Sequence, residues 1–150
     1  MAVLIYCLAQ IGNVFKNILD YAIGKYGYEL VAWVILSNHL HFIVEIESAA
    51  RIPKFVNLVS GKSTIELNKL DKVPGRKIWY QYWDHCIRNE KDFYMYLNYI
   101  HQNPVKHQLV ERMEDCEFSS YRLFLEKYGK QWLIDCFESY PVTDFNPGWG

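Results

Sequence analysis

Two strand-like segments, residues 29–36 and 39–47, are separated by only two residues, and this constrains the fold more than any other feature of the sequence. The first is rich in apolar and β-branched residues, which is typical of a strand covered on both faces. In the second, apolar and polar residues alternate, as on a strand with two different faces. Because only Ser37 and Asn38 separate them, we expect a tight antiparallel hairpin.

Helix and strand patterns flank this hairpin in a regular order. An apolar run over residues 3–9 predicts a first strand, and Asn13 can cap a helix that ends near Gly24 or Gly27. Residues 51–70 predict a second helix that begins near Pro53.

The second half of the chain also alternates between strand and helix patterns. Residues 77–82 are aromatic-rich enough for another strand. Asn89, with Asp92 three residues on, resembles a capping box that opens a helix, and Pro104 is expected to stop this helix near Gln102. A last helix is predicted over residues 120–128. The order β-α-β-β-α-β predicts an α+β, ferredoxin-like antiparallel sheet with helices on one face and extra C-terminal helices.

Length and composition limit the class of protein. A chain of 150 residues that is 51% hydrophobic predicts a single domain over residues 1–150, with a loose tail over 140–150. No apolar run approaches the roughly 20 residues of a membrane span, so we expect a cytoplasmic protein with no membrane partner. The four cysteines contain no CxxC pair, which argues against a zinc site. The net charge of −1 gives no overall attraction to nucleic acid.

His39 and His41 form the first candidate site. Two residues apart on a strand, both imidazoles leave the same face, with α-carbons roughly 6.6 Å apart. That spacing lets two ring nitrogens converge on one divalent ion. A pair of solvated polar histidines is the alternative interpretation.

The helix that ends in residues 98–104 carries the second candidate site. Tyr99 and Asn103 are four residues apart, so they lie within roughly 40° of each other, at the edge of the apolar stripe. An amide oxygen there could ligate a metal, and the phenol could act as a nucleophile. Tyr94 and Asn98 have the same spacing about 140° around the helix, and spacing alone does not choose between the pairs.

Cationic and aromatic residues form a third candidate feature, a surface for nucleic acid. Tyr82 and Trp83 stand close to Arg88, and aromatic faces interleaved with cations suit base stacking and phosphate contact. The alternative is that these aromatic residues are core and the charges are solvated. The cations that could supply local phosphate contacts are Lys54, Lys62, Arg76, Lys77, Arg88 and Lys106.

Together these segments resemble one known family. Residues 37–44, Ser-Asn-His-Leu-His-Phe-Ile-Val, resemble the His-hydrophobic-His signature of single-tyrosine transposases. Residues 99–105, Tyr-Ile-His-Gln-Asn-Pro-Val, are similar to the tyrosine motif of the REP-associated tyrosine transposases, and residues 83–88 and 118–121 resemble segments that flank it. The resemblance extends from about Val14 to Leu125.

The resemblance implies a transposase that cleaves and rejoins single-stranded DNA bearing hairpins. Carried over by position, Tyr99 would be the nucleophile that forms a 5′-phosphotyrosine intermediate, and His39, His41 and Asn103 would bind Mg²⁺ or Mn²⁺. The local pattern of cations and aromatic residues adds six candidate DNA contacts: Lys62, Arg76, Lys77, Trp83, Arg88 and Lys106. A homodimer is compatible with this family, with the tyrosine acting within one chain or across two.

Two other functions stay open. Family members usually carry a longer first-strand region and a more basic surface, so a degenerate protein that binds hairpin DNA without cleaving it is the main alternative. A metal hydrolase unrelated to DNA, using the two histidines with Glu45, is a second. Because each phosphate contact adds to the salt dependence of binding, the low charge predicts weak, moderately salt-sensitive DNA binding.

Overall fold

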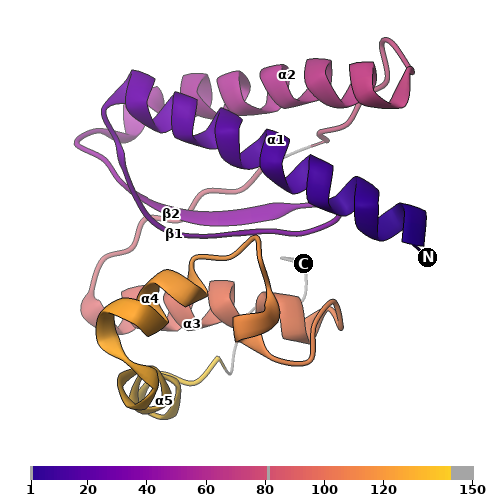
Figure 1. Cartoon of the computed structure of the whole chain (residues 1–150). Helices are drawn as coiled ribbons and strands as arrows, with labels where there is room; N and C mark the ends of the chain where they lie inside the picture. The colour runs from indigo at the N-terminus through magenta and orange to yellow at the C-terminus, as the bar shows by residue number, and fades with distance from the viewer. Residues whose placement is uncertain (1, 81, 143–150) are drawn as a thin grey trace. The chain divides into compact units, whose positions relative to one another are not determined.

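The computed structural model describes residues 2–80 and 82–142, with the side chains from residue 12 onward. Its elements follow one another as α1 (Ala2–Tyr26), β1 (Glu29–Ile35), β2 (Leu40–Glu45), η1 (Ala49–Arg51), α2 (Ile52–Asp71), α3 (Glu90–Lys106), η2 (Met113–Asp115), α4 (Tyr121–Tyr128) and α5 (Lys130–Ser139) (Figure 1). The two strands pair in one sheet, and Leu36 N donates to His39 O (2.9 Å) across the tight turn between them. The α+β class and the antiparallel hairpin are therefore confirmed.

The first strand expected over residues 3–9 is wrong, because α1 occupies Ala2–Tyr26 without a break. A short apolar run has no periodicity that separates a buried strand from a buried helix. Here the run continues into the helical pattern that follows Asn13. Gly27, with a φ of 65°, ends the helix in the left-handed region that glycine adopts easily.

The chain forms two compact units that share the hairpin. Unit 1 comprises the described residues of Met1–Val31, Ile35–Leu40 and Val44–Asp84, and unit 2 those of Ala32–Val34, His41–Ile43 and His85–Gly150. The expectation of one domain over residues 1–150 stays a prediction. Of the tail expected over 140–150, residues 143–150 lie outside the described part.

Unit 1 is built on the packing of α1 against α2, which run side by side in opposite directions (Figure 1). The buried residues of α2 include Phe55, Val59, Ser63 and Leu67, which recur every four positions and so line one face of the helix. Phe15, Leu19 and Ala22 are the corresponding buried residues of α1. Pro53 lies in the first turn of α2, as predicted.

The strand expected over residues 77–82 is absent from the described part of that segment, residues 77–80 and 82. Side chains of α2 hold this segment instead. Trp79 Nε1 donates to Ser63 Oγ (2.8 Å), and Asn68 Nδ2 donates to Arg76 O (2.9 Å). The aromatic residues that favour a strand by propensity are thus fixed by hydrogen bonds to a helix, since strand propensity depends on packing context.

Unit 2 contains α3, α4 and α5. Asn89 caps α3 by accepting from Asp92 N (2.9 Å), which confirms the predicted start. The predicted stop is wrong, because α3 passes through Pro104 and ends at Lys106. Proline removes only its own N–H, and Asn103 and Pro104 are buried in the last turn, where His107 N and Leu109 N still bond back to the helix.

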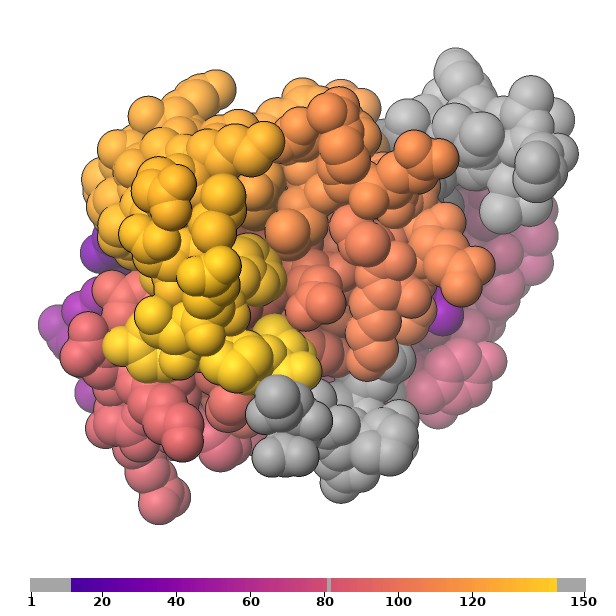
Figure 2. Space-filling model, turned by 90° about the horizontal axis from the view of Figure 1, so that it is seen from below, coloured from indigo at the N-terminus to yellow at the C-terminus, as the bar shows by residue number. Residues whose placement is uncertain are grey.

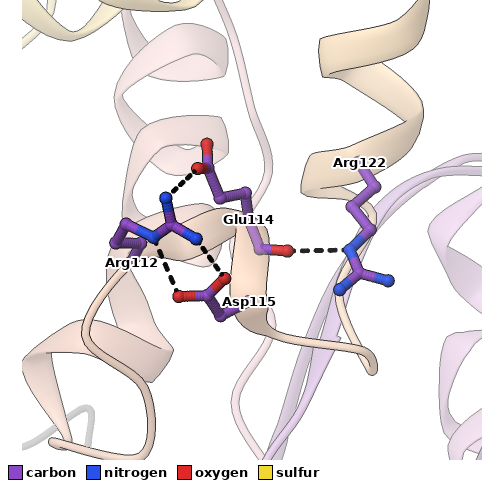
Figure 3. Close-up of polar contacts among 4 residues, drawn as sticks. All are labelled: Arg112, Glu114, Asp115 and Arg122. Atoms are coloured by element: carbon purple, nitrogen blue, oxygen red, sulfur yellow. Dashed lines mark hydrogen bonds and ion pairs between the residues drawn. The ribbon is translucent and has the colours of Figure 1, made fainter.

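The connection from α3 to α4 is fixed by charged side chains (Figure 3). Arg112 pairs with Glu114 (2.9 Å) and forms two hydrogen bonds to Asp115, at 3.0 and 2.9 Å. Arg122 Nε of α4 donates to Glu114 O (2.7 Å). Figure 2 shows α4, α5 and this connection side by side on one face of unit 2, in agreement with their contacts. In the described part of the chain, every helix is too short or too polar to cross a bilayer.

Candidate functional site

His39 lies at the turn of the hairpin, directly before β2, in unit 1. Its Nδ1 is 2.5 Å from Asn38 Oδ1. An amide oxygen can only accept a hydrogen bond, so this contact places a ring hydrogen on Nδ1, and in the neutral ring Nε2 then carries the lone pair. His39 and Asn38 also line a cavity of about 230 Å³ with Phe15 and Trp79. With the hydrogen on Nδ1, the Nε2 atom of a neutral His39 is the one that can ligate a metal.

His41 lies on β2 and belongs to unit 2, where it meets Tyr99 of α3. The two ring centroids are 5.2 Å apart and the planes cross at 75°. Lys106, about two turns of α3 further on, places Nζ 5.4 Å from the centre of the Tyr99 ring. Unit 2 thus brings a predicted metal ligand, the predicted nucleophile and a predicted cation into one cluster.

Tyr99 and Asn103 are more buried than the sequence suggests. They were expected at the edge of the apolar stripe, whereas Tyr99 is 4% exposed and Asn103 is fully buried. Burial raises the pKa of the Tyr99 phenol, and a side-chain hydrogen bond with Asn103 acts in the opposite direction. Apart from this contact with Tyr99, the amide oxygen and nitrogen of Asn103 have no hydrogen-bond partner within the described residues. A buried amide oxygen in this state fits a site that receives a ligand.

Tyr94 and Asn98, the pair with the same spacing, lie in different surroundings in unit 2. Asn98 Nδ2 donates to Cys136 O (3.0 Å) and Tyr140 O (2.9 Å), so it ties α3 to the end of α5. The Tyr94 ring stacks on Tyr140, with centroids 4.9 Å apart. This second pair therefore packs α5 against α3.

The structure adds two polar residues that the sequence analysis did not single out, His101 and Ser120. Both are buried, and His101 Nε2 lies 3.0 Å from Ser120 Oγ. Burial lowers the pKa of His101 to about 3, so the ring is neutral at neutral pH. Residues 118–121 carried only a family resemblance, and nothing in their spacing indicates a partner on α3.

The predicted DNA contacts are exposed and divide between the two units. In unit 1, Lys62 lies over the Tyr21 ring (4.8 Å), Arg76 pairs with Asp71, and Lys77 lies over the Tyr80 ring (4.9 Å). Trp83 is 56% exposed, so it is not a core residue. Arg88 and Lys106 belong to unit 2. These side chains are accessible to a polyanion, and their role stays a prediction.

The predicted metal ligands carry two kinds of donor atom. His39 of unit 1 and His41 of unit 2 would supply imidazoles, which are softer than Mg²⁺ prefers and admit Mn²⁺, and Asn103 of unit 2 would supply an amide oxygen, which suits either ion. The buried Asn103 oxygen and the His39 tautomer agree with that use. In the described part of the chain, no three His, Cys, Asp or Glu side chains gather into an alternative metal site.

Comparisons with known proteins give a consistent result. A family model described as IS200-like transposase matches residues 6–103, a range that contains His39, His41, Tyr99 and Asn103. The REP-associated tyrosine transposase of Escherichia coli K12 is 32% identical over 125 residues, covering 81% of this chain and 68% of that protein. A putative REP-associated tyrosine transposase of Haemophilus influenzae is 30% identical over 132 residues, covering 80% and 75%.

A solved structure extends the similarity to three dimensions. It shows a REP-associated tyrosine transposase bound to a REP hairpin, and it matches this chain with a TM-score of 0.70 at 25% identity. The match covers 89% of this chain and 76% of the other.

Proposed function

Since the chain belongs to the IS200-like transposase family, as a REP-associated tyrosine transposase, we propose that it cleaves and rejoins single-stranded DNA beside hairpins with Tyr99 as nucleophile. The observation that carries this proposal is the contact of Tyr99 with His41, beside the buried Asn103. The hairpin substrate is supported by the related transposase whose structure holds a REP hairpin.

In the proposed reaction, the Tyr99 phenol gives up its proton to solvent, its oxygen attacks the scissile phosphorus, and the bond to the 3′ oxygen breaks. The 3′ oxygen leaves and takes up a proton, while the 5′ phosphate stays on Tyr99 as a phosphodiester. In the reverse step, a 3′-OH attacks that phosphodiester and releases the tyrosine. The strands are rejoined without ATP because the covalent bond retains the energy of the phosphodiester.

The surroundings of Tyr99 act on the attack in opposite directions. Burial raises the pKa of the phenol, so it makes the loss of the phenol proton during the attack harder. The Lys106 ammonium over the ring favours the negative charge that then develops on the oxygen. Bound Mg²⁺ or Mn²⁺, held by His39, His41 and Asn103, would neutralise charge on the scissile phosphate.

DNA binding in this proposal depends on exposed side chains rather than on the net charge of −1. Lys62, Arg76, Lys77, Arg88 and Lys106 would contact phosphates, and Trp83 would stack on an unpaired base. Tyr99 contacts His41 of the same chain, which supports attack within one chain. A homodimer stays a prediction.

The test is the formation of a covalent protein–DNA adduct. Labelled hairpin oligonucleotides from the inverted repeats beside the gene are incubated with the protein and Mn²⁺, then separated on a denaturing gel. We expect an adduct with the unaltered protein and none with Tyr99→Phe. Tyr94→Phe is the matched control, since it removes the tyrosine with the same helical spacing, and it should retain the adduct.

The outcomes separate the alternatives. An adduct that persists in Tyr99→Phe would refute the proposed nucleophile. Hairpin binding without any adduct, unaffected by chelator, would support a binding protein that does not cut. Metal-dependent cleavage of small phosphodiesters that survives Tyr99→Phe and needs the exposed Glu45 would support a hydrolase.

A further inference from the structure

A buried hydrogen-bond link joins α3 to β1 within unit 2, and the proposed chemistry does not use it. Ser120 Oγ accepts a hydrogen bond from Trp33 N (3.0 Å) and bonds to His101 Nε2 (3.0 Å). Ser120 N donates to Trp33 O (2.9 Å), so the serine is held at two points on β1. His101 is 0% exposed and Ser120 is 1% exposed.

The packing around this link leaves the imidazole little freedom. The His101 ring meets the Tyr121 ring nearly at right angles (87°), with centroids 5.4 Å apart, and the Phe124 ring at 5.0 Å. Ser119, the neighbour of Ser120, forms a bridge to Val34 of β1. The imidazole is thus packed between aromatic rings, and its partner is anchored to the sheet.

The chain before Ser120 is also fixed. The charged network of η2 ends in the hydrogen bond from Arg122 Nε to Glu114 O (Figure 3). This bond joins the first turn of α4 to η2 and so restrains the segment that carries Ser120. A restrained serine can hold α3 in place, whereas a serine on a mobile loop would follow the helix.

The position of His101 on α3 connects this link to the proposed site. His101 is two residues from both Tyr99 and Asn103, so it points about 160° away from each around the helix axis. A bond on one side of a helix fixes its rotation, and rotation decides where residues on the opposite side point. Because β1 pairs with β2, the strand of His41, the link ties the position of Tyr99 to the strand that His41 occupies.

We propose that His101 and Ser120 are positioning residues that hold Tyr99 and Asn103 against His41. The proposal rests on the proposed function, because Tyr99 must be the nucleophile for its placement to affect a rate. A displacement of about 1 Å costs a catalytic site on the order of 100-fold in rate. Loss of the link therefore lowers the rate of adduct formation while leaving DNA affinity nearly unchanged.

The test compares two buried serines. Ser120→Ala removes the link, and Ser63→Ala removes a hydroxyl that is equally buried and also accepts from an N–H group, that of Trp79 in unit 1. His101→Phe is a second route, since it keeps an aromatic ring against Tyr121 and Phe124. Each variant is measured for its melting temperature, its hairpin Kd, and the rate of adduct formation at saturating DNA.

We expect Ser120→Ala and His101→Phe each to slow adduct formation by about 10-fold or more with Kd within about twofold. The double variant should be no slower than the slower single variant, because the two residues form one link. Ser63→Ala should lose stability without a comparable loss of rate. Equal slowing by Ser63→Ala and Ser120→Ala, or a wild-type rate in both link variants, would overturn the proposal.

Amide hydrogen exchange gives a readout that is independent of activity. We expect faster exchange across residues 99–103 in Ser120→Ala and unchanged exchange there in Ser63→Ala. If the unaltered protein forms no adduct, the proposed function fails, and the exchange data still decide whether the link orders this part of α3. Unchanged exchange in Ser120→Ala would overturn the positioning role by itself.

Discussion

The two compact units use their buried polar side chains differently. In unit 1, Ser63 and Asn68 of α2 bind the segment that carries Trp79 and Arg76, so buried polar groups support an exposed, cationic stretch of chain. In unit 2, the buried polar pair lies beside the proposed nucleophile instead. His101 is on α3, the helix of the buried Tyr99, and its partner Ser120 lies directly before α4.

This difference indicates that unit 1 contributes mainly to DNA affinity and unit 2 mainly to the rate of the reaction. A residue that contacts a polyanion works best exposed, where its loss affects affinity and salt dependence. A nucleophile works best in fixed geometry, where its loss affects rate. We therefore expect substitutions in the exposed segment of unit 1 to change binding, and those around Tyr99 in unit 2 to change the rate of chemistry.

The largest expected effect comes from the predicted metal ligand of unit 2. His41→Ala should lower the rate of adduct formation at saturating DNA by about 100-fold or more, because the charge on the scissile phosphate is then poorly neutralised. Chelation of the unaltered protein should have a comparable effect, reversed by Mn²⁺. Glu45→Gln on the same strand is the control and should keep its rate. Equal loss in both variants would contradict the predicted ligand set.

The next effect concerns stability and depends on His101. Its pKa is about 3 when folded and about 6.5 when unfolded, so only the unfolded chain takes up this proton between those values. The free energy of unfolding should therefore fall as the pH drops below 6.5, by about 1.4 kcal/mol per pH unit. Urea unfolding at pH 7 and at pH 5 measures this difference in the free energy of unfolding.

His101→Phe supplies the control for this measurement. The variant should lose most of the pH dependence between pH 6.5 and 5, a difference of about 2 kcal/mol. The same slope in both proteins would show that His101 is not buried as a neutral ring. It would also remove the contrast between the two units, since the polar core of unit 2 would then be hydrated.

The smallest expected effect comes from the exposed segment of unit 1. Lys77→Ala should weaken hairpin binding a few-fold and reduce the slope of log K against log salt by about 0.7, as one lost phosphate contact predicts. The rate at saturating DNA should not change. Lys127→Ala on α4 is the matched control, because that lysine also lies over a tyrosine ring, at 5.2 Å. If the unaltered protein, Lys77→Ala and Lys127→Ala had the same salt slope, Lys77 would not be a DNA contact.

The elements that could be predicted from the sequence depend on neighbours in the chain. The hairpin at Ser37 and Asn38, the Asn89 cap and the start of α2 near Pro53 are set by a few adjacent residues, and all three are confirmed. The strand expected over residues 3–9 and the stop at Pro104 are wrong, since continuation of the helix and burial of its last turn depend on more distant contacts.

The candidate site shows the same limit. Spacing places Tyr99 with Asn103 and Tyr94 with Asn98 equally well, and only tertiary contacts distinguish a tyrosine against His41 from one stacked on Tyr140. The pairing of His101 with Ser120, 19 residues apart, leaves no trace in the periodicity of either segment. The roles of Tyr99 and of the metal ligands stay predictions until they are tested.

Mapping the covalent adduct tests the central claim most directly. Trypsin releases residues 92–106 as one peptide that contains Tyr94, Tyr96 and Tyr99, so fragment ions are needed to locate a nucleotide on one of them. We expect the 5′ phosphate on Tyr99 alone. An adduct on Tyr94 or Tyr96, or on any residue outside α3, would contradict the assignment of the chemistry to the buried cluster of unit 2.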